Sequence, residues 1–489
     1  MLLRLHVQGF KNLVDTEIRF GPLTCIAGPN GVGKSNIFDA IRFLSLLADK
    51  PFVEAVQAMR CDDVSDLFTH GGDRRMRFEC DLLIPAEGYD AFNQLARTDQ
   101  TLLTYAIEMS WFDDRDRHRL QLEEETLVAI PQRDMVSRIG FDHGSDWRRS
   151  LQHGTVHRAK PFIETDRSES AAEILLHADP VEDENDDKRP SGFPMGQLPR
   201  TVLSSAQRAD AASTAVLVRN DMRAWRTLHL EPSALRCAAT FNGPSYLGDD
   251  GSRMPAALYR LAQLDDEARV YAEVANRLAQ ILDDVDSVRV ERDTVRRVYR
   301  FVLRDRLGAE FSTTALSDGS LRFLALTVFG LDQEASTVLC LEEPENGIHP
   351  ERIEAVMNVL IDQAVDPFWP VGQDNPLRQV IFSTHSSVIA SHVDRDSLLF
   401  ADRQNVLVES AAADQANEEG QRSTWINSLV LRPVHQGWRV QNGQTVAARG
   451  SVVSYINAYY PRPAEGRDGD RSVSAYESVG GKKPANFEL

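Results

Sequence analysis

The sequence predicts an α/β protein with a parallel sheet around a phosphate-binding loop, an antiparallel β subdomain, and a helical and β insertion that splits the core. Strand and helix patterns alternate over residues 1–47 and again over 316–400, which is typical of a parallel sheet. Residues 60–135 instead show consecutive strand patterns joined by polar turns, which favours antiparallel pairing.

The elements follow in order along the chain. Residues 2–10, 18–20 and 23–27 predict strands, and the apolar positions of 34–47 recur at helical spacing. Further strands are predicted over 76–84, 102–111 and 118–127, helices over 201–230 and 255–283, and a strand pair over 285–311. The last part predicts helix 319–332, strand 337–341, helix 350–364, strand 378–383 and helix 386–391.

A chain of 489 residues exceeds one typical domain of roughly 150 residues, so several units are expected. Residues 179–190 are acidic and nearly free of apolar side chains, which predicts a solvated loop. The expected units are an N-terminal lobe 1–135, an insertion 136–284 that is helical and holds the acidic loop, a C-terminal lobe 285–410, a small segment 411–460 and a disordered tail 461–489.

Composition excludes several classes. The chain has 54 Lys and Arg against 73 Asp and Glu, a net charge of −19, which argues against a protein coated in nucleic acid or anionic lipid. No apolar run approaches the ~18 residues of a membrane span, and the N-terminus lacks a signal-peptide pattern, so we expect a cytoplasmic protein without membrane contact. The five cysteines form no CxxC pair, and Cys25 and Cys340 are expected to be buried thiols.

The segment GPNGVGKS, residues 28–35, fits the phosphate-loop pattern GxxxxGK[ST] between a strand and a helix. Its glycines let backbone N–H groups face phosphate oxygens, and the helix N-terminus adds a favourable field. We expect Lys34 to reach the β- and γ-phosphates and Ser35 to bind Mg²⁺. The candidate nucleotide-binding residues here are Asn30, Gly31, Gly33, Lys34, Ser35 and Asn36.

The apolar strand Val338–Leu341 is followed by Glu342 and Glu343. We expect this strand to neighbour the one that precedes the phosphate loop, with Glu342 holding Mg²⁺ and Glu343 polarising a water molecule. The alternative is an ordinary pair of acids at a helix start.

Two further segments become informative only in combination. Ser317 and Gly319 begin a helix, where they could form an anion site or an ordinary cap. His385 follows the strand 378–383, where a lone histidine is more often structural than catalytic.

In this order, the four segments resemble the phosphate loop, signature, Walker B strand and switch histidine of ATP-binding-cassette (ABC) ATPases. The chain resembles the branch with structural-maintenance-of-chromosomes (SMC), RecF and OLD (overcoming lysogenisation defect) ATPases. Residues 342–350, EEPENGIHP, are especially similar to OLD-like anti-phage ATPases. Asp318 stands where the signature usually has glycine, and neither Gln57 nor Gln94 marks a glutamine loop.

The resemblance implies an ABC-ATPase head that uses ATP and Mg²⁺. Two heads would form a homodimer around ATP, with Ser317 and Gly319 of one chain on the γ-phosphate held by the other. His385 would sense that phosphate, Glu343 would activate water, and residues 345–348 would form the D-loop. Ser317 follows Ser35 by 282 residues, a gap too long for a transporter head.

Two biological roles follow from the resemblance. The first is the sensor ATPase of an anti-phage complex, Septu-like or PARIS-like, with a separate nuclease or toxin-like effector chain. A built-in nuclease is disfavoured because its candidate acids, Glu409, Asp468 and Asp470, lack the expected strand and glycine context. The alternative is a RecF-like ATPase that binds double-stranded DNA in repair.

A basic strip could support that alternative as a phosphate-contacting face, or its arginines could pair with Glu291, Asp293 and Asp305 on a solvated sheet. The strip comprises Arg289, Arg292, Arg296, Arg297, Arg300, Arg304 and Arg306.

Overall fold

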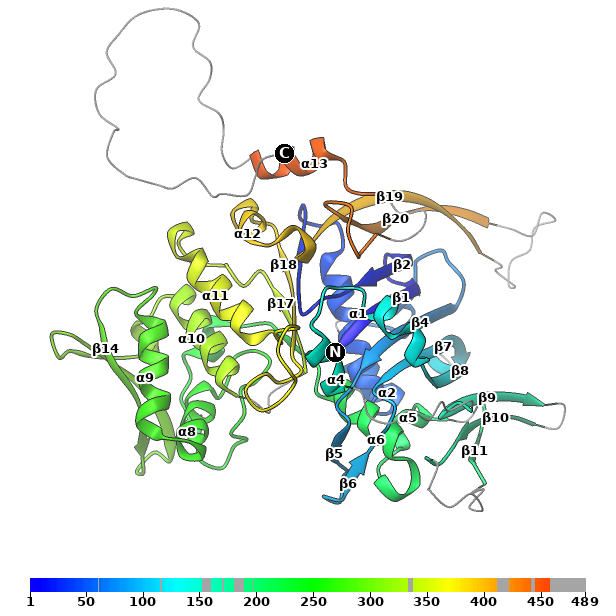
Figure 1. The fold of residues 1–489 in the computed structure, drawn as a ribbon. Helices are drawn as coiled ribbons and strands as arrows, with labels where there is room; N and C mark the ends of the chain where they lie inside the picture. Colours follow the sequence, from blue (N-terminus) through cyan, green and yellow to red (C-terminus); the bar gives the residue numbers. More distant parts are fainter. Residues whose placement is uncertain are drawn as a thin grey trace, which may run out of the picture.

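The chain folds around two large β-sheets, and the helix α1 (Lys34–Leu47) lies between them (Figure 1). The structure is a computed structural model. It describes residues 1–59, 61–114, 117–151, 160–168, 171–179, 189–196, 198–332, 337–410, 422–440 and 445–457.

The first sheet is the parallel core that carries the phosphate loop. Its order is β12-β17-β18-β3-β19-β20, and every neighbouring pair is parallel except β19 with β20. Its strands are β3 (Leu23–Ala27), β12 (Arg226–Leu228), β17 (Val338–Glu342), β18 (Gln379–Thr384), β19 (Leu398–Ser410) and β20 (Arg422–Pro433). The predicted direct pairing of the phosphate-loop strand with the acid-bearing strand is wrong, because β18 lies between β3 and β17.

Helices cover both faces of this sheet because its side chains alternate in direction. Ile26, Cys340 and Ile381 join the core cluster of α1 (Lys34–Leu47). The intervening side chains, such as Phe382, join a second cluster with the helices of the other face. Those helices are α8 (Met254–Leu264), α9 (Glu267–Leu278), α10 (Asp318–Leu331), α11 (Ile353–Gln363) and α12 (Ser387–His392).

The second sheet is antiparallel and packs on the free side of α1, where Phe43 lies 6.0 Å from Phe10 and 6.1 Å from Phe78. Its order is β11-β10-β9-β8-β7-β4-β1-β2. Its strands are β1 (Leu2–Phe10), β2 (Leu13–Arg19), β4 (Arg75–Leu83), β7 (Leu102–Asp114), β8 (Arg117–Ala129), β9 (Ile163–Ser168), β10 (Ala171–Leu176) and β11 (Ser191–Pro194). The fold class predicted from the sequence is therefore confirmed.

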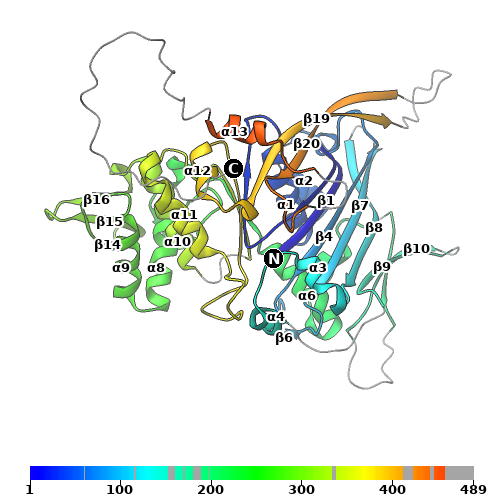
Figure 2. The ribbon, with the colours of Figure 1, turned by 45° about the horizontal axis from the view of Figure 1, so that its top comes forward.

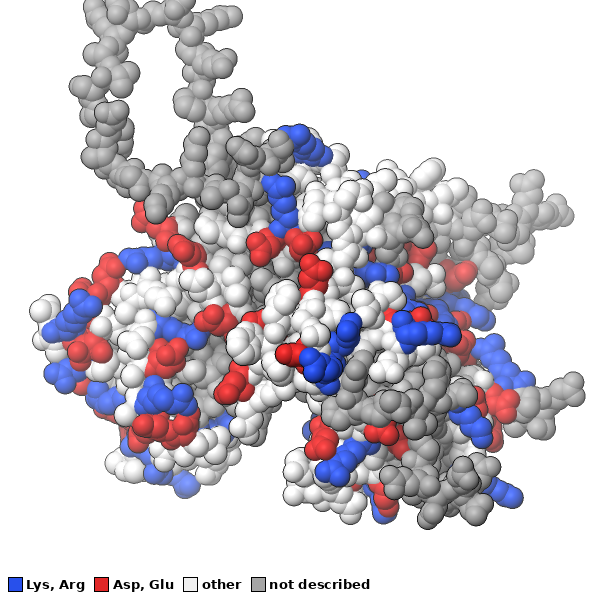
Figure 3. Space-filling view, in the orientation of Figure 1, with Lys and Arg blue, Asp and Glu red and all other residues white. Residues whose placement is uncertain are grey.

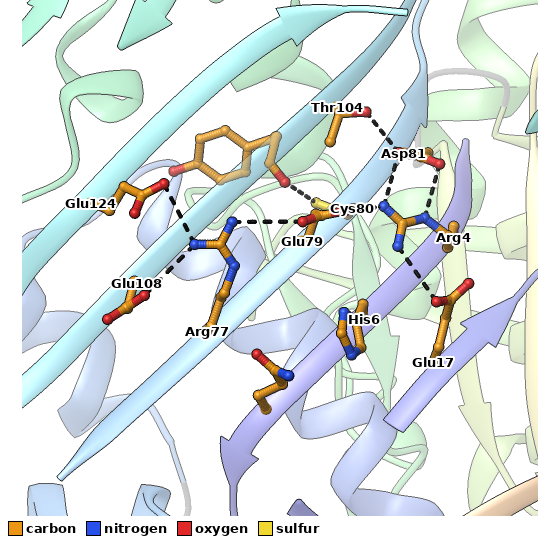
Figure 4. A network of polar contacts seen from close by, with 12 residues as sticks. Arg4, His6, Glu17, Arg77, Glu79, Cys80, Asp81, Thr104, Glu108 and Glu124 are labelled. Atoms are coloured by element: carbon orange, nitrogen blue, oxygen red, sulfur yellow. Dashed lines mark hydrogen bonds and ion pairs between the residues drawn. The ribbon is translucent and has the colours of Figure 1, made fainter. Parts of the chain in front are cut away.

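An ion-pair network ties strands β2, β1, β4, β7 and β8 together on the outer face of this sheet (Figure 4). The Arg4 guanidinium contacts Asp81 at 3.0 Å and also pairs with Glu79, while Arg77 reaches Glu108 at 3.6 Å. The neighbouring carboxylates raise the pKa of Arg4 despite its burial. These charge pairs therefore stabilise the register of the neighbouring strands.

The remaining α-helices and strands flank these two sheets (Figure 1). They are α2 (Phe52–Gln57), β5 (Glu87–Tyr89), β6 (Leu95–Arg97), α3 (Met135–Ile139), α4 (Ser145–Leu151), α5 (Val202–Ser205), α6 (Ala209–Arg223), α7 (Pro232–Leu235), β13 (Ala239–Thr240), β14 (Val285–Asp293), β15 (Val298–Asp305), β16 (Glu310–Ser312) and α13 (Arg449–Asn457). Figure 2 shows α8, α9 and β14–β16 as a lobe on the far side of the parallel sheet from β7–β10.

The predicted helical insertion at 136–284 differs from the structure in two places. Strands β9–β11 extend the antiparallel sheet beyond residue 135, and β12 joins the parallel sheet inside the segment 201–230 that was predicted as helical. β12 has only three residues, so its pairing with β17 decides its conformation. The acidic residues 180–188 and the tail 461–489 lie outside the described residues, as do Asp468 and Asp470.

Part of the basic strip on β14 and β15 is engaged in internal contacts. Arg289 pairs with Glu291 at 2.6 Å and with Glu310 at 3.0 Å, and Arg292 lies over the ring of Phe241. Figure 3 shows basic and acidic side chains interspersed over the lobe of α8, α9 and β14. These contacts favour the paired, solvated interpretation of the strip. Within the described part of the chain, no helix is long and apolar enough to cross a membrane.

Candidate nucleotide-binding and hydrolysis site

The phosphate loop connects β3 to α1 with the backbone that its glycines permit. Gly31 and Gly33 have φ values of 73° and 105°, in the left-handed region that favours glycine. No side chain caps the start of α1, and its first turn has no acidic residue. The uncapped N–H groups and the helix dipole therefore suit an anionic ligand such as a triphosphate.

Lys34 lies inside this loop, where its Nζ donates to the carbonyl oxygens of Gly28 and Pro29 at 2.8 Å each. Ser35 is exposed at the first turn of α1, and Asn30 and Gly31 are exposed on the loop. The Ser35 hydroxyl and the Glu342 carboxylate offer oxygen atoms, which are the ligands that Mg²⁺ prefers. The residues present thus fit a Mg²⁺-bound nucleotide.

Neighbouring segments hold the loop from two sides. The Asn12 amide donates to Val32 O at 3.0 Å and accepts from the Asn36 amide at 2.7 Å. Arg403 of β19 donates to the carbonyl oxygen of Gly31. The Asn36 side chain, predicted to bind nucleotide, is thus engaged with Asn12.

The structure brings Glu343 and His385 together, at the carboxyl ends of β17 and β18. His385 Nδ1 lies 2.9 Å from Glu343 Oε1, and the Asn346 amide donates to Glu343 Oε2 at 2.7 Å. The backbone N–H of Glu343 donates to Ser383 O at 2.9 Å, and its φ is 48°. Both carboxylate oxygens are therefore oriented by neighbours, at a backbone conformation that a non-glycine residue rarely adopts.

Charge and burial link these acids to the phosphate loop. Burial lowers the pKa of Lys34, while the negative charges of Glu343, Glu345 and Glu342 act to raise it. Glu345 is 7% exposed, and burial raises its pKa although Thr384 donates to its Oε1. A nearby triphosphate would further favour the protonated form of Lys34.

The predicted signature residues lie on the other face of the parallel sheet from α1. Ser317 is exposed and caps α10, accepting from Ser320 N at 3.2 Å. Gly319 is buried against the backbone of Gly347, and a Cβ at Gly319 would overlap the Gly347 carbonyl oxygen. Asp318, which replaces the usual glycine, pairs with Arg236 at 2.6 Å. The contact of Ser317 and Gly319 with the nucleotide of a second chain stays a prediction.

Sequence reasoning missed the supporting residues Arg322 and Arg403, and it gave Asn346 no individual role beside Glu343. Asn346 lies within the motif 342–350, so its proximity to Glu343 could have been predicted from the sequence. Arg403 has no motif near it in the sequence that would have predicted its contact with the phosphate loop. Gln57 ends α2 and Gln94 lies between β5 and β6, away from the parallel sheet.

The chain matches two family models and short stretches of several known proteins. The family model described as "AAA domain, putative AbiEii toxin, Type IV TA system" matches residues 137–391, more than half of the chain, and a second AAA-domain model matches 4–51. The chain is 51% identical over 43 residues to "DNA replication and repair protein RecF" of Magnetococcus marinus, covering 9% of this chain and 11% of that protein. It is 54% identical over 41 residues to "OLD nuclease" of Thermus scotoductus, covering 8% of each.

These stretches span only about a tenth of the length of the curated relatives. A crystal structure of an SMC head bound to the C-winged-helix domain of ScpA aligns with 87% of this chain and 98% of that chain, at 12% identity and a TM-score of 0.45. The chain belongs to the AAA-domain family of the first model. Its local sequence matches are to proteins of the RecF and OLD type.

Proposed function

We propose that this chain binds ATP with Mg²⁺ and hydrolyses it to ADP and phosphate. The observation that carries the proposal is the Glu343 carboxylate, which His385 and Asn346 hold at the same sheet edge as the phosphate loop. An oriented carboxylate beside a buried lysine is the arrangement that phosphoryl transfer to water requires.

Each residue has a defined task. Backbone N–H groups of 30–35 would bind phosphate oxygens, Lys34 would neutralise charge on the β- and γ-phosphates, and Ser35 with Glu342 would hold Mg²⁺. Mg²⁺ would supply charge neutralisation at the phosphates. Glu343 accepts a proton from the attacking water, and His385 contacts the γ-phosphate region.

We further propose that two chains form a head-to-head homodimer around ATP. Ser317 is exposed and lies across the parallel sheet from α1, so it is available to a second chain. ATP would then favour the closed dimer, and hydrolysis would release it.

Glu343→Gln tests the enzymatic proposal, because the amide keeps the shape but cannot accept a proton. Steady-state turnover should fall by about 100-fold or more while ATP binding remains. Glu351→Gln, an exposed substitution nearby, is the matched control. Turnover that is equal in Glu343→Gln and wild type would refute the role of Glu343.

For the biological role, we propose a cytoplasmic sensor ATPase of an anti-phage complex with a separate effector chain. The family description and the OLD match support this context. The RecF match supports the alternative, a DNA-binding ATPase in repair.

Mass spectrometry of what co-purifies with Glu343→Gln and ATP from the native host separates the two roles. A stoichiometric nuclease or toxin-like chain supports the defence role. DNA with repair proteins and no effector favours the RecF-like role.

A further inference from the structure

The loop that carries Glu343 rests directly on the first turn of α10. Gly319 lies buried against the backbone of Gly347, leaving no room for a Cβ between them. Gly347 adopts a φ of 80°, which lets the loop turn toward the helix. The start of α10 and the loop 343–348 therefore cannot move independently at this point of contact.

Arg322, on the next turn of α10, ties the helix to the same loop. Its Nη1 donates to the carbonyl oxygen of Asn346 at 2.8 Å. Its Nε donates to Leu230 O at 3.3 Å, just after β12. One partly buried side chain thus connects α10 with the segments that follow β17 and β12.

Asn346 continues this connection to the carboxylate. Its amide donates to Glu343 Oε2 at 2.7 Å, and its backbone N–H donates to Glu343 O at 3.0 Å. Because Glu343 adopts a left-handed φ of 48°, its orientation depends on such external contacts. The contacts of Arg322 with Asn346 and of Asn346 with Glu343 form a continuous path from α10 to the carboxylate.

We propose that Arg322 and Asn346 are positioning residues that couple the exposed start of α10 to the orientation of Glu343. A ligand or second chain that docks on Ser317 would move the first turn of α10, and this path would align the carboxylate for hydrolysis. The inference rests on the proposed ATPase function. Through these contacts, docking at the start of α10 would change the position of Glu343, the residue proposed to activate water.

The test compares Asn346→Ala, Asn346→Asp, Arg322→Ala, Arg322→Lys and the double alanine variant with wild type. We measure kcat and KM for ATP, with the affinity for a fluorescent ATP analogue as the check on folding. Both single alanine variants should lower kcat by about 10- to 100-fold and leave KM and nucleotide affinity within about twofold, since a misplaced carboxylate affects the chemical step. Asn346→Asp keeps the shape without the donor, so it should lose as much activity as Asn346→Ala.

Two results would show that Arg322 acts on Glu343 through Asn346. Arg322→Lys should recover part of kcat because an ammonium can still donate to Asn346 O, and the double variant should be no slower than the slower single variant. Arg277→Ala removes ion pairs with Glu273 and Asp362 on the same side of the sheet and should leave kcat unchanged.

Full activity of Asn346→Ala overturns the inference, as does an additive double variant or an equal loss of nucleotide affinity. These outcomes are distinct from failure of the proposed function. If wild type does not hydrolyse ATP, or Glu343→Gln retains turnover, the ATPase proposal itself fails.

Discussion

Glu125 should make folding stability fall as pH rises from about 5 to 7. This carboxylate is fully buried on β8, where it accepts hydrogen bonds from Val202 N at 2.7 Å, Leu203 N at 2.9 Å and the Tyr105 hydroxyl at 3.0 Å. Burial raises its pKa from 4.5 to about 7, against the effect of these donors. The carboxyl group therefore links the middle of β8 to the start of α5. Its burial there disfavours the ionised form of the side chain.

The sign follows from proton binding. Because the pKa in the folded chain exceeds that in the unfolded chain, the folded state retains a proton between pH 4.5 and about 7. The contribution of Glu125 is thus fully present below pH 4.5, declines as pH rises through this window, and stays constant above it. A pKa difference of this size corresponds to about 3 kcal/mol across the window.

The assay is urea unfolding at half-unit steps from pH 5 to 8 for wild type and Glu125→Gln, with Glu123→Gln as a control on the same strand. In Glu125→Gln, the decline in unfolding free energy between pH 5 and 7 should shrink by about 2 kcal/mol, because the titrating group is gone and only part of its full window is sampled. The control should follow wild type. An unchanged pH dependence in Glu125→Gln would refute the assignment of a raised pKa to this carboxylate.

Three further substitutions probe the nucleotide site. Lys34→Ala should weaken ATP binding by about 100-fold or more, measured by equilibrium titration, because the lysine charge faces the phosphates; retained affinity would contradict the phosphate-loop assignment. Asn12→Ala removes the hydrogen bond to Val32 O that supports the loop and should weaken ATP binding by about fivefold, in line with a loss of about 1 kcal/mol; an unchanged affinity would mean that the loop needs no such support. Gly319→Ala must displace the Gly347 carbonyl and should lower kcat by about 100-fold through misplacement of the adjoining loop, while wild-type turnover would show that α10 and this loop move freely.

Local patterns predicted much of this protein because they reflect local physics. The helix α1 occupies residues 34–47 as expected, since its apolar side chains recur with the period of one helical face. The phosphate loop was predictable because glycine at 31 and 33 is what its backbone requires. The acid pair at the end of β17 and the histidine after β18 were visible for a similar reason, since each directly follows a run of apolar strand residues.

Only the tertiary structure decided which strands are neighbours and which side chains meet. β18 separates β3 from β17, and the three-residue strand β12 exists through its pairing with β17, so neither feature leaves a periodic signal. Arg403 reaches Gly31 across 372 residues of sequence, a contact set by long-range packing of β19 on β3. The sequence alone determined the local chemistry of each segment, whereas sheet order, which depends on pairing between distant segments, determined how those segments form one site.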